Sequence, residues 1–138
     1  FHFALRVPAQ YVFSNAVFHW ISDHDALLEN IHKALKPQGV LVCEFGASGN
    51  IATILNAFAE ACNSLGYGYE TKFNFPTAED FGESLKKNGF VIDRIYEYDR
   101  PTVLKDGEQG LANWMKQFFA SELEVVPEYV QAMVFEKV

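Results

Sequence analysis

The chain has 138 residues, of which 49% are hydrophobic and 15% aromatic, so it can fill a sizeable core and one globular domain is expected. Its 18 acidic and 11 basic residues give a net charge of -7, which repels phosphate backbones and anionic lipid surfaces and argues against nucleic-acid and membrane partners. No apolar run approaches the roughly 20 residues that span a bilayer, and the first residues lack a secretion-signal pattern, so we expect a soluble, cytoplasmic protein.

The first clear element is a short strand. Residues 1–8 fit neither a strand nor a helix. The apolar residues 11–13 predict a strand, and the small and polar residues Ser14, Asn15 and Ala16 follow at its carboxyl end as a loop.

A helix and a second strand are predicted next. Ser22, with Asp25 three positions on, is expected to cap an amphipathic helix that runs to about Leu35. Residues 36–39, Lys-Pro-Gln-Gly, end this helix because proline cannot continue the hydrogen-bond ladder and glycine permits a left-handed turn. The unalternating apolar run 40–45 is typical of a strand buried on both faces of a parallel sheet.

Two further helices are predicted from their capping residues. Asn50 is expected to cap a helix that ends at residues 66–68, Gly-Tyr-Gly. Thr77 with Asp80 forms a capping box at the start of a shorter helix, and residues 88–89, Asn-Gly, end it in a left-handed turn.

The last third of the chain predicts two strands around one helix. Residues 90–98 predict a strand, and residues 111–119 carry apolar side chains at helical spacing. Residues 129–138 predict a closing strand because alternate positions from Val130 to Val134 are apolar. No helix pattern lies tight against both strands, so we expect one of them to be antiparallel.

The two cysteines are expected to be buried free thiols. Cys43 lies in an apolar run and Cys62 on an apolar helical stripe. Their spacing matches neither a metal site nor a disulfide framework, so the sequence predicts no metal site.

Several motifs resemble one enzyme family. Residues 13–20 are similar to the loop after the fourth strand in methyltransferases of the trans-aconitate methyltransferase group, where asparagine-alanine precedes an aromatic pair. Residues 34–41 match the L-K-P-G-G turn into the fifth strand, with Gln38 in place of a glycine. Asn88-Gly89-Phe90 before a strand and Asn113-Trp114 in a late helix also resemble this group. Over nearly its whole length the chain thus resembles class I, Rossmann-like S-adenosylmethionine-dependent methyltransferases.

The resemblance implies an α/β fold with a partial Rossmann-like methyltransferase sheet. Strands four to seven, with flanking helices and an antiparallel last strand, would be present. The family's first three strands have no counterpart here, nor does the G-x-G-x-G loop over which S-adenosylmethionine lies or the acidic residue that holds its ribose. We therefore expect residues 1–138 to form a single truncated domain, the C-terminal half of the family's domain, without a complete cofactor pocket.

The loop after the first strand holds the candidate cofactor and catalytic residues. The resemblance implies that Ser14, Asn15 and Ala16 border S-adenosylmethionine, and they follow a strand's carboxyl end, where ligands bind in open α/β sheets. Alternatively, the first two only satisfy loop backbone groups. His19 is the candidate catalytic residue, as a base or substrate contact, because it lies in an aromatic loop. Its alternative is a histidine packed against Trp20 and bonded to backbone.

The candidate substrate-binding residues are spread along the chain. Glu44 interrupts an apolar run, where an ionised carboxylate costs several kcal/mol unless paired, so it either serves a site or pairs with Arg94 or Arg100. Aromatic residues could roof a small-molecule pocket or form plain core. The full set is Trp20, Glu44, Phe45, Phe73, Phe75, Arg100, Asn113 and Trp114.

The expected function is methyl transfer from S-adenosylmethionine to a small acceptor. A carboxylated acceptor is one candidate, because Arg100 could bind a carboxylate bidentately or could equally be a solvated strand end. The alternative is a non-catalytic remnant that acts as a dimerisation or interaction module. Either the missing N-terminal half or a second copy would cover the exposed edge of the first strand, and a homodimer would use Phe13 with Leu28 or Ile31.

Overall fold

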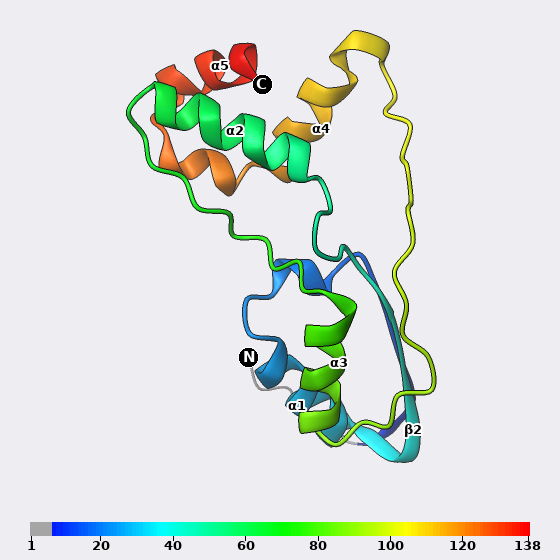
Figure 1. The fold of residues 1–138 in the computed structure, drawn as a ribbon. Helices are drawn as coiled ribbons and strands as arrows, with labels where there is room; N and C mark the ends of the chain where they lie inside the picture. Colours follow the sequence, from blue (N-terminus) through cyan, green and yellow to red (C-terminus); the bar gives the residue numbers. More distant parts are fainter. Residues whose placement is uncertain (1–6) are drawn as a thin grey trace. The chain divides into compact units, whose positions relative to one another are not determined.

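The computed structural model describes residues 7–138, which form two compact units (Figure 1). The first, here called the sheet unit, comprises residues 7–50 and Phe73–Tyr98. The second, the helical unit, comprises Ile51–Lys72 and Asp99–Val138. Among the described residues, no helix has the length and apolar character needed to cross a membrane.

The sheet unit contains two parallel strands, β1 (Ala9–Asn15) and β2 (Leu35–Glu44). Their pairing runs in register from Tyr11 opposite Val40 to the last residue of each strand. The two strands predicted in this part of the sequence, and the parallel sheet, are confirmed. Because the strands are parallel and in register, their carboxyl ends lie together.

The turn predicted at residues 36–39 is a bulge within β2. Residues 36–39 stand opposite a single residue of β1, Gln10. Gln38 has a positive φ of 64°, and its carbonyl accepts a hydrogen bond from Gln10 Nε2 at 3.3 Å. The Pro-Gln-Gly sequence therefore turns the backbone as expected, but the strand already begins before the turn.

Helix α1 (His24–Ala34) begins at a different cap from the predicted one. Asp23 caps it, because Asp23 Oδ1 accepts a hydrogen bond from the Ala26 N–H at 2.9 Å. The prediction of Ser22 as cap is wrong by one position, which is the usual uncertainty when two capping residue types are adjacent.

One face of the sheet packs against helices, and the other is exposed. The buried cluster consists of Phe18, Leu28, Ile31 and Phe81, with Val12, Leu27, Leu35, Leu41, Cys43, Phe45, Leu85 and Phe90 packed against it. On the opposite face Tyr11 and Phe13 are each 72% exposed, and Val42 is 53% exposed. The prediction that the second strand is buried on both faces is wrong, because the helices of this unit cover only one face.

Helix α3 (Ala78–Lys87) begins and ends as predicted. Thr77 Oγ1 accepts a hydrogen bond from the Asp80 N–H at 3.1 Å, and Gly89 has a φ of 84° after the last turn. The strand predicted at 90–98 is wrong, because among the described residues only β1 and β2 form a ladder. Phe90 packs on the core, but Val91 is 96% exposed, so the apolar pattern is satisfied at its start only.

The helical unit is built from α2 (Ala52–Ser64), α4 (Gly110–Phe118) and α5 (Glu128–Lys137), and α2 lies beside α5 (Figure 1). The first two match predicted helices. Asn50 does not cap α2: the N-cap is Ile51, in a left-handed conformation with no side-chain cap. Cys43 in the sheet unit and Cys62 in α2 are free thiols, the first half-buried and the second buried.

The closing strand predicted at 129–138 is wrong, because these residues form helix α5. Val130 and Val134 are both buried, which fits helical spacing as well as strand alternation, whereas Ala132 between them is exposed. The predicted strands four to seven thus reduce to two in the described residues, and the fold is a mixed α/β structure with a small parallel sheet.

Candidate functional site

The carboxyl ends of β1 and β2 form the base of the site. The Ala16 N–H donates a hydrogen bond to the Glu44 carbonyl at 2.7 Å, and the φ of 54° at Ala16 turns the chain away from β1. Within residues 7–138 the side chains of Ser14 and Asn15 have no hydrogen-bond partner, so they are available to a ligand. Glu44, opposite Asn15, is half-buried.

His19 lies in the short 3-10 turn Phe18–Trp20, called η1, that follows this loop. The Gly46 N–H donates a hydrogen bond to His19 Nδ1 at 3.2 Å. A backbone N–H can only donate, so Nδ1 is the acceptor and the neutral ring carries its hydrogen on Nε2. Burial lowers the pKa of His19, which favours this neutral form. The ring can therefore offer Nε2–H to a ligand as a donor, while its lone pair is already engaged.

Three aromatic side chains surround the His19 ring. Its centroid lies 5.4 Å from Trp20, 6.2 Å from Phe73 and 5.5 Å from Phe75. Phe73 and Phe75 stack on each other at 5.3 Å, and Trp20 lies 4.6 Å from Phe73. The structure thus brings four predicted site residues into one cluster, here called the His19 cluster.

Gly46 leaves no room for a side chain beside this cluster. A Cβ atom at Gly46 would lie 2.6 Å from Asn50 Nδ2 and 2.6 Å from the Phe75 ring. A larger residue would displace both the aromatic ring and the N–H that binds His19. The sequence pattern indicates only a loop at Gly46, because it does not show how closely Phe75 approaches this residue.

Asn74 and His24 also contribute, and the sequence analysis missed both. The Asn74 N–H donates to the His19 carbonyl at 2.9 Å, and its side chain reaches the loop from Ile21 to His24. A shallow depression of about 350 Å³ adjoins them, lined by Ser22, Asp23, His24, Asp25, Asn74, Pro76, Asp80, Phe81 and Ser84. The lining of this depression includes no residue of the His19 cluster.

The remaining predicted site residues lie elsewhere. Phe45 belongs to the core, where its ring packs against Phe18 and Phe81. Arg100, Asn113 and Trp114 belong to the helical unit and cannot be assigned to the His19 cluster. Asn113 Nδ2 donates to Asp106 Oδ2 at 3.2 Å, and the Trp114 ring packs against Phe118 and Phe119.

Comparison with known proteins gives two matches. A family model described as a methyltransferase domain matches residues 5–95. A Schizosaccharomyces pombe protein named uncharacterized methyltransferase C70.08c is 27% identical over 129 residues, with 84% of this chain and 50% of that protein covered. The chain therefore spans about half the length of this relative.

Proposed function

Because this chain belongs to the methyltransferase-domain family, we propose that it contributes to methyl transfer from S-adenosylmethionine to a small carboxylated acceptor. We further propose that it corresponds to the C-terminal half of a domain of the trans-aconitate methyltransferase group. The observation that carries the proposal is the His19 ring, held by the Gly46 N–H among aromatic side chains at the carboxyl ends of two parallel strands. Ligands of open α/β sheets bind at this edge.

The loop after β1 suits the cofactor. Ser14 and Asn15 offer a hydroxyl and a carboxamide that bond no other described residue, and both groups suit an amino acid carboxylate or ammonium. With Ala16 they form the proposed cofactor-binding residues. S-adenosylmethionine, when bound, supplies the electrophilic methyl group.

The His19 cluster suits an acceptor that is already ionised. Its Nε2–H donates and its lone pair is occupied, so we propose that His19 orients an acceptor oxygen instead of removing a proton from it. A carboxylate needs no base near neutral pH, and the rings of Trp20 and Phe75 can exclude water around it. Glu44, beside Asn15, would repel a second carboxylate and so limit where a larger acceptor's charges lie.

The test uses this chain joined to the N-terminal half of a domain of the family, and measures transfer of isotope-labelled methyl from S-adenosylmethionine to a set of small carboxylic acids, each paired with its amide. We expect label in the acids and not in the amides. His19→Phe, which keeps a ring but loses the donor, should reduce the rate by about 10-fold or more. His32→Phe is the matched control, because His32 is exposed on α1. Equal labelling of acids and amides, or no loss in His19→Phe, would contradict the proposal.

The exposed sheet face supports a proposed homodimer. Tyr11, Phe13 and Val42 offer apolar surface there, whereas Leu28 and Ile31, which the sequence analysis assigned to the contact, are buried in the core. We propose contact through the face with Phe13. Sedimentation at tens of micromolar should show a dimer, and Phe13→Asp should yield a monomer; a monomeric unmodified chain would overturn this.

A further inference from the structure

The Asn74 side chain hydrogen-bonds to the loop that follows His19 and Trp20, and Asn74 has no role in the proposed chemistry so far. Asn74 Nδ2 lies 3.0 Å from the Ser22 carbonyl, 3.2 Å from the Ile21 carbonyl and 3.4 Å from His24 Nδ1. The Asn74 N–H donates to the His19 carbonyl at 2.9 Å. A single residue of the segment before α3 thus bonds both the turn with His19 and the loop after it.

The chemistry of these contacts requires a neutral donor at position 74. The two carbonyl oxygens can only accept, so the Asn74 amide must present its NH₂ group to them. The two hydrogens of this NH₂ group face three acceptors, so at least one hydrogen is shared between two acceptors. A carboxylate of the same shape would place oxygen against oxygen, with no hydrogen to share.

His24 extends this arrangement to the start of the turn. His24 Nε2 lies 2.9 Å from the Phe18 carbonyl, which can only accept, so Nε2 carries the hydrogen. His24 Nδ1 is then the acceptor that faces Asn74. The bonds run from Asn74 through His24 to Phe18, and a second bond runs from Asn74 directly to His19. Asn74 therefore positions both of the first two residues of η1. Its side chain acts on Phe18 through His24, and its backbone N–H bonds the His19 carbonyl.

The neighbours of Asn74 connect it to the His19 ring itself. Phe73 and Phe75 flank it in sequence, and both rings contact His19. Phe75 also adjoins Gly46, whose N–H binds His19 Nδ1. A shift of Asn74 would therefore move the backbone of His19, two rings that pack on it and the neighbourhood of the group that fixes its tautomer.

From these contacts we propose that Asn74 is a positioning residue for the His19 cluster, acting as an obligatory hydrogen-bond donor to the loop 18–24. The proposal rests on the proposed function for its catalytic meaning. In this proposal Asn74 acts through His19. Its effect is to keep His19 Nε2–H directed to the acceptor, and misplacement of such a group by about 1 Å can cost about 100-fold in rate.

The experiment compares Asn74→Ala and Asn74→Asp with the unmodified chain. Asn30→Ala is the matched control, because Asn30 also donates to a main-chain carbonyl, that of Ala26, at 2.8 Å but within α1. Long-range proton–nitrogen NMR correlations report which ring nitrogen of His19 and His24 carries hydrogen. Circular dichroism reports folding, and the methyl-transfer assay reports the rate.

At neutral pH we expect the Nε2–H form of both histidines in the unmodified chain and in Asn30→Ala. Both Asn74 variants should show mixed tautomers at His19 and a rate about 10- to 100-fold lower, with the KM for S-adenosylmethionine changed much less. A variant that keeps the His19 tautomer and a rate within about twofold of the unmodified chain would overturn the proposal.

Asn74→Asp supplies a pH test that a purely structural role would not show. Protonation of the carboxyl at position 74 supplies one O–H donor, so the His19 tautomer and the rate should recover in part as pH falls, over the range in which the His19 ring stays neutral. Nearby charged groups are Asp23, Asp25 and Asp80 in the depression, with Lys87 bonded to Asp25, and the rings of Phe45 and Phe81 face His24. The unmodified chain and Asn74→Ala should show no such recovery, and recovery in all three would overturn the proposal.

The NMR measurement separates this inference from the proposed function. It requires neither cofactor nor acceptor, so loss of the His19 tautomer in Asn74→Asp tests the positioning role even if no carboxylic acid is methylated. If neither Asn74 variant folds at neutral pH, Asn74→Asp is measured at acid pH, where a restored donor should refold it. An Asn74→Asp chain that stays unfolded at acid pH would overturn the proposal.

Discussion

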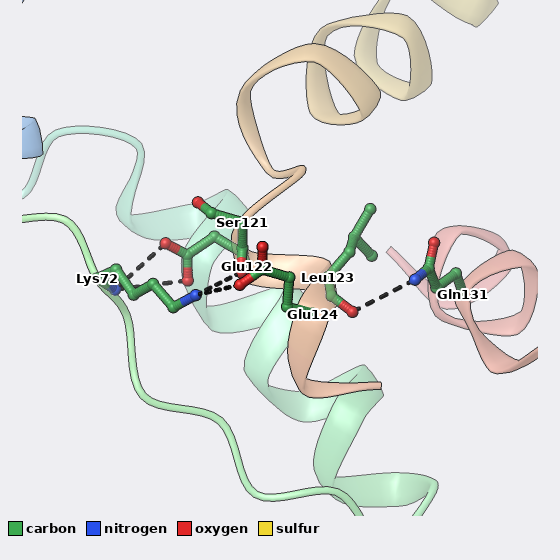
Figure 2. Close-up of polar contacts among 6 residues, drawn as sticks. All are labelled: Lys72, Ser121, Glu122, Leu123, Glu124 and Gln131. Atoms are coloured by element: carbon green, nitrogen blue, oxygen red, sulfur yellow. Dashed lines mark hydrogen bonds and ion pairs between the residues drawn. The ribbon is translucent and has the colours of Figure 1, made fainter. Parts of the chain in front are cut away.

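In each unit a polar side chain bonds a segment about 50 residues away: an amide in the sheet unit and a carboxyl group in the helical unit. In the sheet unit the neutral amide of Asn74 donates to the loop near His24. In the helical unit the carboxylate of Glu122 accepts from the Lys72 N–H at 3.2 and 3.4 Å (Figure 2). Glu122 is 1% exposed, so its carboxyl group lies in the interior, with a backbone N–H as its partner.

The ammonium group of Lys72 does not serve this buried carboxylate. It donates to the Ser121 carbonyl at 2.7 Å and to Glu124 Oε2 at 3.1 Å, both at the exposed surface (Figure 2). Burying a carboxylate that has few hydrogen-bond donors raises the free energy of the folded state. Burying a neutral amide that is hydrogen-bonded raises it much less. Polar substitutions should therefore affect stability most in the helical unit and the geometry of His19 most in the sheet unit.

The largest expected effect is on the free energy of unfolding. It comes from loss of a ring in the buried core of the helical unit, compared with loss of a ring on the exposed face of the sheet unit. Phe58 is fully buried, with its ring 5.2 Å from Phe119, so Phe58→Ala should lower the free energy of unfolding by about 3–5 kcal/mol. Phe13→Ala removes the same ring from a 72% exposed position and, at concentrations too low for the proposed dimer, should change the free energy of unfolding by less than about 0.5 kcal/mol. Urea denaturation followed by circular dichroism measures both. A large cost for Phe13→Ala would mean that its face is covered in solution.

Glu122 provides the second test. Glu122→Ala leaves a void and an unpaired Lys72 N–H, so we expect a loss of about 2–4 kcal/mol. Glu122→Gln keeps an oxygen acceptor without the charge and should lie within about 1 kcal/mol of the unmodified chain. Lys72→Ala, which removes an exposed ion pair, should cost less than about 1 kcal/mol. A large loss in Glu122→Gln would show that the charge itself stabilises this unit.

Local signals in the sequence predicted most of the sheet unit. The strands at 11–13 and 40–45 and the cap at Thr77 depend on neighbours within a few residues, and all three were found. His19 and its aromatic partners were identified as candidates, and they do meet. The roles of Asn74 and Gly46 could not be predicted, because they depend on contacts with residues about 27 to 55 positions away along the chain.

The two strands that were predicted wrongly have different causes. In one segment the apolar pattern fits both a strand and a helix, and in the other the segment has no strand to pair with. Val130 and Val134 would share one face of a strand and also share one face of a helix. The structure has the helix α5, with both valines buried and Ala132 between them exposed. Residues 90–98 have strand character, but a ladder needs a paired backbone, and in the described residues neither β1 nor β2 pairs with this segment. The family match covers residues 5–95, so it includes the whole His19 cluster and ends before the segment that follows residue 98.

Helix capping gives a smaller effect that tests one correct and one wrong prediction. Thr77→Ala removes the bond from the Asp80 N–H to the cap of α3 and should cost about 1 kcal/mol. Asn50→Ala should cost less than about 0.5 kcal/mol, because Asn50 does not cap α2. Chemical denaturation of the two variants decides. Equal losses would indicate that Asn50 stabilises the chain through another contact.

The smallest expected effect concerns an ion pair between α1 and α3. The Lys87 ammonium donates to Asp25, and Asn88 Nδ2 donates to the same carboxylate at 3.1 Å. The hydrogen bond from Lys87 is the main cause that lowers the pKa of Asp25, while the pair raises the pKa of Lys87. Both side chains are at the surface, so the contribution is small and salt should weaken it.

The sign of its pH dependence follows from the direction of the Asp25 shift. A carboxyl whose pKa is lower in the folded chain than in the unfolded chain stabilises the fold above its unfolded value of about 3.9. That contribution is lost as pH falls below about 4, through the lowered folded value, because protonation removes the charge that Lys87 bonds. Lys87→Met should therefore flatten the acid side of the stability curve at low salt, and the difference from the unmodified chain should shrink at high salt. Asp25→Asn should flatten the same window, whereas Lys33→Met should leave it unchanged, because Lys33 pairs with Glu29 within α1 and does not join it to α3. Urea midpoints measured across this pH range would contradict the assignment if Lys33→Met and Lys87→Met behaved alike.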